Sequence, residues 1–218
     1  SFLEGKQLQS VLPIHCREVG SMIARFTNIS KSSKLKRENS LNIETWENIF
    51  NKCKESEDKS YQKYFDILEQ ELSFLKNNWP TNLPKAIIHA DLFQDNIFFI
   101  KDKISGLIDF YFSCEDFIAY EIALAINAWC FEPDFSFNIA KARRMLEAYQ
   151  KVRALDGNEI DAFPILAQGA AMRFLLTRLY DWLNTPAAAL VTCKDPMELH
   201  AKLHFHTRVS DARAYGLD

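Results

Sequence analysis

The stretch of residues 87–110, IIHADLFQDNIFFIKDKISGLIDF, constrains the fold most, because its apolar runs are too short for helices. Apolar runs at 86–88 and 97–100 flank the segment 89–96, which is rich in polar residues, and a third apolar run ends in Asp109. Short apolar runs bounded by polar and turn residues are typical of buried strands. We therefore expect strands on both sides of the segment, followed by a hairpin that leads to Asp109.

Outside this stretch, apolar residues recur at three- and four-residue steps, the spacing of helices with one buried face. We expect such helices over residues 13–28, 43–53, 58–79, 136–155 and 158–184, and from 196 onward. Ser136 is expected to cap its helix, and Pro164 to break the helix that contains it. The range 118–131 is apolar on nearly every side, which predicts a fully buried helix. The predicted fold class is mainly α, with a small β-hairpin insertion.

Composition excludes several classes of partner. The chain has 218 residues, 48% of them hydrophobic, which is enough for one large domain or two small ones. A net charge of -3 gives no reason to expect binding to nucleic acid or to an acidic membrane surface. No apolar run reaches the roughly 18 residues that a membrane span needs. The five cysteines are odd in number and far apart, which predicts reduced thiols in a cytoplasmic protein.

Three oxygen-bearing side chains have the order that phosphoryl transfer requires. This reaction needs a group that accepts the proton of the attacking hydroxyl, and hard oxygen ligands for metal ions on the phosphates. Asp91 and Asn96, five residues apart on one loop, can supply the base and a metal ligand, and Asp109 can supply a second ligand. Taken singly, each is also a common turn or capping residue, but the ordered set favours a kinase of the protein-kinase type.

Residues 89–96, HADLFQDN, resemble the Brenner-type motif of the aminoglycoside phosphotransferase and choline kinase superfamily. Further strings extend the resemblance to its bacterial homoserine kinases, over most of residues 87–209: HADLFQDNIFF, SGLIDFYFSC, LAINAWCFEPD, RFLLTRLYDWLNTP, ALVTCKDP and KLHFHTRV. Two positions depart from the family, which usually has Pro at Gln94 and Asp at Glu121.

The resemblance implies a protein-kinase-like C-terminal lobe of the aminoglycoside phosphotransferase type. It also implies ATP-dependent phosphorylation of the hydroxyl of L-homoserine in threonine biosynthesis, with ATP, homoserine and Mg²⁺ as ligands. On the catalytic loop 89–96, Asp91 would be the catalytic residue and His89 would orient the loop. Asn96 and Asp109 would bind the metal.

Residues 1–5, SFLEG, resemble the hinge at which the N-terminal lobe of these kinases ends, so residues 6–218 are expected to form the C-terminal lobe. Phe2 and Leu3 are then expected to contact the nucleotide. The N-terminal lobe of the family carries a loop that covers the phosphates and a lysine that binds them. The chain has neither a glycine-rich loop nor such a lysine, and we expect the isolated lobe to be weakly active or inactive.

An amino-acid substrate needs a partner for its carboxylate and another for its ammonium. Arginine suits the carboxylate and an acid suits the ammonium. Arg173, Arg178 and Asp181, in the string most specific to homoserine kinases, are the candidates. Arg178 and Asp181 could equally form a helix-surface pair, since they are three residues apart.

Two other functions are alternatives to a homoserine kinase. The chain could be a choline or aminoglycoside kinase, or an inactive lobe that acts as a binding module.

Overall fold

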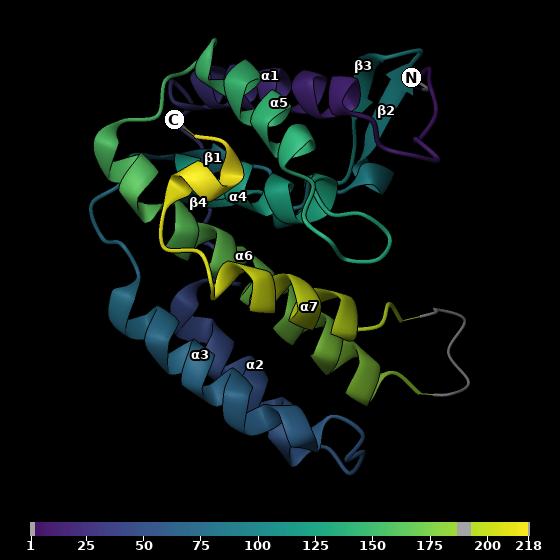
Figure 1. The fold of residues 1–218 in the computed structure, drawn as a ribbon, viewed down its shortest axis with the longest axis vertical. Helices are drawn as coiled ribbons and strands as arrows, with labels where there is room; N and C mark the ends of the chain where they lie inside the picture. Colours follow the sequence, from purple (N-terminus) through teal and green to yellow (C-terminus); the bar gives the residue numbers. More distant parts are fainter. Residues whose placement is uncertain (1–2, 187–192, 218) are drawn as a thin grey trace.

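The computed structural model describes residues 3–186 and 193–217, which form seven α-helices, four short 3₁₀ helices and two short antiparallel sheets (Figure 1). The helices are α1 (Pro13–Ser30), α2 (Ile43–Glu55), α3 (Phe65–Asn78), α4 (Ile118–Trp129), α5 (Ile139–Gln150), α6 (Gly157–Asn184) and α7 (Met197–His206). The strands are β1 (Lys85–Ile88), β2 (Ile97–Ile100), β3 (Lys103–Leu107) and β4 (Cys114–Phe117). Strand β1 pairs with β4, and β2 pairs with β3. The predicted fold class is confirmed.

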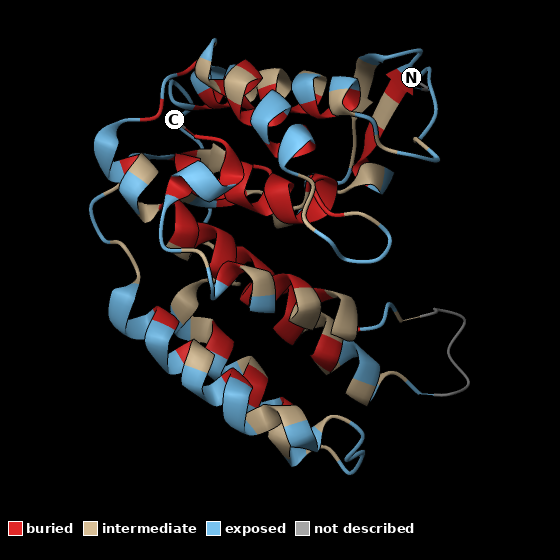
Figure 2. Cartoon of the chain, viewed as in Figure 1, coloured by how far each residue is buried: buried red, intermediate tan, exposed pale blue. Residues whose placement is uncertain are grey.

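The helices lie in layers, with α1 and α5 packed together at one end and α2 and α3 at the other (Figure 1). Between them α4 packs against α6, and α6 also contacts α2 and α7. Buried residues concentrate in α4 and in much of α6, so the core lies between the outer layers (Figure 2). Among the described residues, no helix combines the length and hydropathy that crossing a membrane requires.

Helix α4 is the centre of the core, because every residue from Ile118 to Trp129 is buried. A helix that is apolar on all sides is stable only when other elements cover it completely. Strands β1 and β4, together with α1, α5 and α6, provide that cover. The predicted buried helix over 118–131 is confirmed, and two polar residues, Glu121 and Asn127, are buried with it.

Helix α6 runs without a break from Gly157 to Asn184, so the predicted break at Pro164 is wrong. The helix begins with a capping box, in which Asp156 and Glu159 each accept a hydrogen bond from the backbone N–H of the other, at 2.9 and 3.1 Å. A proline inside a helix costs about 3 kcal/mol, because it removes a backbone hydrogen bond and its ring clashes with a carbonyl of the preceding turn. Pro164 is buried, and the contacts of α6 with α2, α4 and α7 maintain the helix across it.

Two other helix boundaries differ from those predicted, because local turn contacts compete for the capping residues. Helix α3 begins at Phe65, and Asp58 instead accepts hydrogen bonds within a turn that precedes it. Helix α5 is capped by the side chain of Asn138, not by Ser136, and it ends at Gln150, earlier than predicted.

Candidate active site

The chain between β1 and β2, residues 89–96, forms a loop that rests on the C-terminal end of α4. The indole Nε1 of Trp129 donates a hydrogen bond to the carbonyl oxygen of Leu92 at 2.6 Å. In return, Nε2 of Gln94 donates to the carbonyl oxygen of Ala128 at 3.1 Å. The core helix therefore fixes the middle of the 89–96 loop.

His89 connects the start of this loop to the segment that leads to Asp109. Its ring is fully buried, and Nε2 donates to the carbonyl oxygen of Ile108 at 3.0 Å. Burial lowers the pKa of His89, and the bond to Ile108 offsets part of that effect. A buried ring that links these two segments supports the loop-orienting role of His89, which stays a prediction.

Ala90 adopts the left-handed conformation, with φ of 65°, which costs an L-residue roughly 1–2 kcal/mol. Its N–H donates to Oε2 of Glu121 at 2.9 Å, and its carbonyl oxygen accepts from Nη1 of Arg173 at 2.5 Å. Both side chains are buried. Burial raises the pKa of Glu121 to about 7, although backbone bonds from the loop and the charge of Arg173 act to lower it. Two buried polar side chains outside the loop thus hold Ala90 in a backbone conformation that is unfavourable for an L-residue.

Asp91 follows Ala90 and lies beside Asn96. The amide Nδ2 of Asn96 donates to the backbone oxygen of Asp91 at 2.8 Å and to its Oδ2 at 3.2 Å. Burial raises the pKa of Asp91, and the charge of Arg173 lowers it in part. With its amide nitrogen turned to Asp91, Asn96 keeps the geometry in which its amide oxygen could be the ligand that the sequence predicts.

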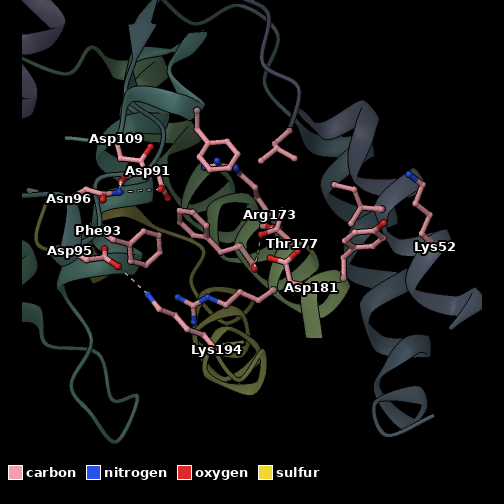
Figure 3. Close-up of a pocket in the computed structure, with 16 residues that line it drawn as sticks. Lys52, Asp91, Phe93, Asp95, Asn96, Asp109, Arg173, Thr177, Asp181 and Lys194 are labelled. Carbon is pink, nitrogen blue, oxygen red and sulfur yellow. Dashed lines mark hydrogen bonds and ion pairs between the residues drawn. The ribbon is translucent and has the colours of Figure 1, made fainter. Parts of the chain in front are cut away.

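Asp109 follows β3 in a left-handed conformation, with φ of 61°. The backbone N–H of Ile108 donates to the carbonyl oxygen of Asn96 at 3.1 Å, which brings Asp109 beside the loop. Asp91, Asn96 and Asp109 line one cavity of about 520 Å³ and lie together on its strand side (Figure 3). Carboxylate and amide oxygens are hard ligands, so Asn96 and Asp109 form a donor set that fits a divalent cation.

Helix α6 forms the opposite wall and carries the three residues predicted to bind a substrate. Arg178 forms an ion pair with Glu198, with 2.7 Å between Nη1 and Oε2. The alternative of a helix-surface pair between Arg178 and Asp181 is therefore wrong. Asp181 has no ion pair with a basic side chain in residues 3–186 or 193–217, and burial raises its pKa. Arg173 lines the same cavity, but its Nη1 is occupied by the backbone of the 89–96 loop.

Two lysines that line the cavity were not predicted from the sequence. Lys194 forms an ion pair with Asp95 at 3.4 Å. Lys52, on α2, has its Nζ 5.9 Å from the ring centroid of Tyr180. Lysines on helix surfaces and loops are common, and only the packing of distant elements brings these two to the site. Glu121 did leave a signal, as a lone acid within an apolar helix.

Of the residues predicted to contact a nucleotide, Phe2 lies outside the described residues. Leu3 is described, and its side chain packs directly on Gly106. A Cβ atom added at Gly106 would lie 2.8 Å from the Leu3 side chain. Lys6 and Phe99 exchange backbone hydrogen bonds of 3.0 and 2.9 Å, so the segment before α1 lies along β2. The predicted hinge stays a prediction.

Comparisons with known proteins agree with this geometry. Residues 1–155 match the phosphotransferase enzyme family. The whole chain matches the homoserine kinase of Agrobacterium fabrum with 46% identity over 217 residues, and that of Parvibaculum lavamentivorans with 50% identity over 218 residues. The chain covers 67% and 68% of these two proteins, and so spans about two thirds of their length.

Solved structures share the fold at low sequence identity. The Plasmodium vivax ethanolamine kinase matches with a TM-score of 0.66 and 19% identity, over 99% of this chain and 65% of that one. An amicoumacin kinase, solved with AMP-PNP and Ca²⁺, matches with a TM-score of 0.68 and 13% identity, over 97% of this chain and 64% of that one. The chain belongs to the phosphotransferase enzyme family, together with the homoserine kinases that it matches along its whole length.

Proposed function

We propose that this chain belongs to a homoserine kinase, which transfers the γ-phosphoryl group of ATP to the side-chain hydroxyl of L-homoserine. The observation that carries the proposal is the identity of 46% and 50% to homoserine kinases over the whole chain. The cavity in which Asp91, Asn96 and Asp109 meet supports it. The same relatives favour a cytoplasmic enzyme of threonine biosynthesis.

In this reaction Asp91 accepts a hydrogen bond from the homoserine hydroxyl and takes its proton as the oxygen attacks the γ-phosphorus. The new oxygen–phosphorus bond forms while the bond to the β,γ-bridging oxygen breaks, and ADP leaves with that oxygen. Asp91 serves mainly by position, because a correctly oriented acceptor lowers the barrier more than a mobile one. Asn96 holds Asp91 in this position through its bond of 3.2 Å to Oδ2.

The side chains of Asn96 and Asp109 would hold Mg²⁺. Bound there, the cation supplies positive charge that neutralises the phosphate oxygens. Asn96 keeps its amide nitrogen on Asp91, so its amide oxygen would be the atom that binds the cation. The hydrogen bonds between them therefore fix the position of Asp91, the proton acceptor, relative to Asn96, the cation ligand.

The wall opposite Asp91 has the charges that a zwitterionic amino acid needs. Asp181 would accept the ammonium group, because no basic side chain in the described ranges pairs with it. Arg178 and Lys194 would bind the carboxylate, which would share them with, or displace, their ion-pair partners Glu198 and Asp95. Both basic side chains lie near the ring of Phe93, with Cζ of the arginine and Nζ of the lysine each 5.6 Å from its centroid. The hydroxyl end of the substrate then faces Asp91 across the cavity.

The alternatives predict different cavity chemistry. A choline kinase needs aromatic rings around a quaternary ammonium, and an aminoglycoside kinase needs several acids. Aromatic rings and acids line this cavity as well, so the feature that favours an acceptor with a carboxylate is the presence of Arg178 and Lys194. An inactive lobe would bind homoserine or a partner without turnover. Calorimetry with Mg²⁺-ATP on this chain tests the inactive-lobe alternative. A dissociation constant below about 1 mM would argue against it.

ADP release by the full-length gene product, with L-homoserine, choline, ethanolamine or an aminoglycoside as acceptor, tests the proposal. We expect turnover with homoserine and little with the others; turnover with choline but not with homoserine would contradict the assignment. Asp91→Asn should abolish turnover and leave the calorimetric affinity for ATP nearly unchanged. Near-normal turnover in that variant would contradict the role of Asp91.

A further inference from the structure

Arg173 is held in the cavity wall by contacts within the protein. Its side chain is only 3% exposed. The guanidinium carbon lies 4.9 Å from the ring centroid of Phe174 and 5.7 Å from that of Phe112. Nη1 donates to the carbonyl oxygen of Ala90 at 2.5 Å, and no ion pair within the described part of the chain includes Arg173. The strongest directed contact of this buried cation is therefore to the backbone of the 89–96 loop.

The two hydrogen bonds to Ala90 hold the two peptide planes that meet at this residue. The N–H bound by Glu121 belongs to the peptide that joins His89 to Ala90, and the carbonyl bound by Arg173 belongs to the peptide that joins Ala90 to Asp91. Because each plane is rigid, the angle between the planes is set by φ and ψ of Ala90 alone. Holding both planes keeps φ at 65°. The second plane ends at the Cα atom of Asp91, the atom that carries its side chain, so holding this plane also sets the position from which the Asp91 side chain leaves the loop.

We propose that Arg173 is a positioning residue, which holds the peptide between Ala90 and Asp91 so that the Asp91 carboxylate faces the cavity. This inference rests on the proposed function, in which Asp91 accepts the proton. Arginine suits the place better than lysine, because a planar guanidinium can stack on aromatic rings while a nitrogen at its edge reaches the carbonyl. The carboxylate of the substrate is left to Arg178 and Lys194.

The test compares two acceptors that differ only in the carboxylate. L-Homoserine and 3-aminopropan-1-ol share a hydroxyl and an amine, and the second lacks the carboxylate. The kinetic constants of both are measured on the full-length gene product with Arg173→Met or Arg173→Lys. We expect kcat to fall about 100-fold in Arg173→Met and about 10-fold in Arg173→Lys with either acceptor, because small displacements of a reacting group carry costs of this size. The KM of homoserine, and the ratio of kcat/KM between the acceptors, should stay within about 2-fold of wild type.

Three results separate this inference from its rivals. A large rise in the KM of homoserine, with loss of the preference for homoserine, would overturn it, because Arg173 would then bind the carboxylate. A wild-type kcat in both variants would overturn it too. If Arg173→Met does not fold, Arg173→Lys decides, because it keeps the charge and most of the volume. Wild-type protein that does not phosphorylate homoserine would contradict the proposed function instead.

Arg153 provides a matched control, as a buried arginine away from the cavity. It is 9% exposed, and its Nη2 donates to both carboxylate oxygens of Glu159, at 2.8 and 2.9 Å. Arg153→Met should lower the melting temperature, since it leaves a buried carboxylate without its partner, while kcat below that temperature stays at wild type. The same pattern in Arg173→Met would mean a purely structural role. Arg178→Met should abolish the preference for homoserine, as expected for a carboxylate ligand.

Discussion

Replacing Glu121 with glutamine should change how the stability of the chain depends on pH. The carboxyl is fully buried. Burial raises its pKa from the ordinary 4.5 to about 7, against the loop backbone bonds and the charge of Arg173. Between these two values the folded state keeps a proton that the unfolded state has already lost.

The sign and size of the effect follow from that proton. Where the folded state binds more protons than the unfolded state, the free energy of unfolding falls as pH rises. The loss of unfolding free energy caused by the buried Glu121 carboxylate is absent below pH 4.5 and complete above about pH 7. At about 1.4 kcal/mol for each tenfold change in proton affinity, it amounts to about 3 kcal/mol. Glutamine can still accept the hydrogen bond of Ala90 but does not titrate, so the variant should lack this dependence.

Urea denaturation of wild type and Glu121→Gln, repeated from about pH 4 to about pH 8, measures the difference in unfolding free energy. As pH rises, the unfolding free energy of the variant should increase relative to that of wild type by about 3 kcal/mol. A constant offset is expected as well, because Oε1 of Glu121 has no hydrogen-bond partner in the described structure and the glutamine NH₂ would take its place. A difference independent of pH would refute the reasoning. Glu47→Gln is the control: Lys76 lowers the pKa of its exposed carboxyl below 4.5, so its effect should be opposite in sign and confined to the acid end of the range, with no change near pH 7.

Three further substitutions test packing and capping. Trp129→Phe removes the donor to the carbonyl oxygen of Leu92 and should lower the unfolding free energy by about 1–3 kcal/mol; an unchanged thermal melt would contradict this. Gly20→Ala places a Cβ atom 2.0 Å from the carbonyl oxygen of Met145, and should cost about 1–3 kcal/mol in urea denaturation through forced separation of α1 and α5. Asp156→Ala removes the cap of α6 and should cost about 1 kcal/mol, whereas Asp156→Asn, which keeps an acceptor, should melt near wild type.

Local patterns explain why much of the fold could be predicted from the sequence. The buried helix α4 is visible as continuous apolar sequence, and the spacing of Asp91, Asn96 and Asp109 is visible without any tertiary contact. Strand β4, with the sequence CEDF, could not be predicted because its strand conformation depends on pairing with β1. The predicted break at Pro164 was wrong for the same kind of reason, because burial and packing around α6 outweigh the local preference of proline against a helix interior.

The far wall of the cavity could be predicted only in part. Arg178 and Asp181 were found through family resemblance, but the pairing of Arg178 with Glu198 depends on how α7 packs on α6. Lys52 comes to the cavity from a helix distant in sequence. Arg173 was identified as a residue of the site, yet its contact with the 89–96 loop depends on a backbone conformation that no sequence pattern specified.

Helix α4 holds the 89–96 loop at two places, through Glu121 near its start and Trp129 at its end. At 1.5 Å per residue, these two anchors are about 12 Å apart along the helix axis. A substitution that slides or tilts this helix must therefore displace Asp91, even when the altered side chain is far from any ligand. In a genetic screen, such alleles should impair growth while protein abundance remains normal, and they should be suppressed by second changes that restore the volume of the neighbouring helix.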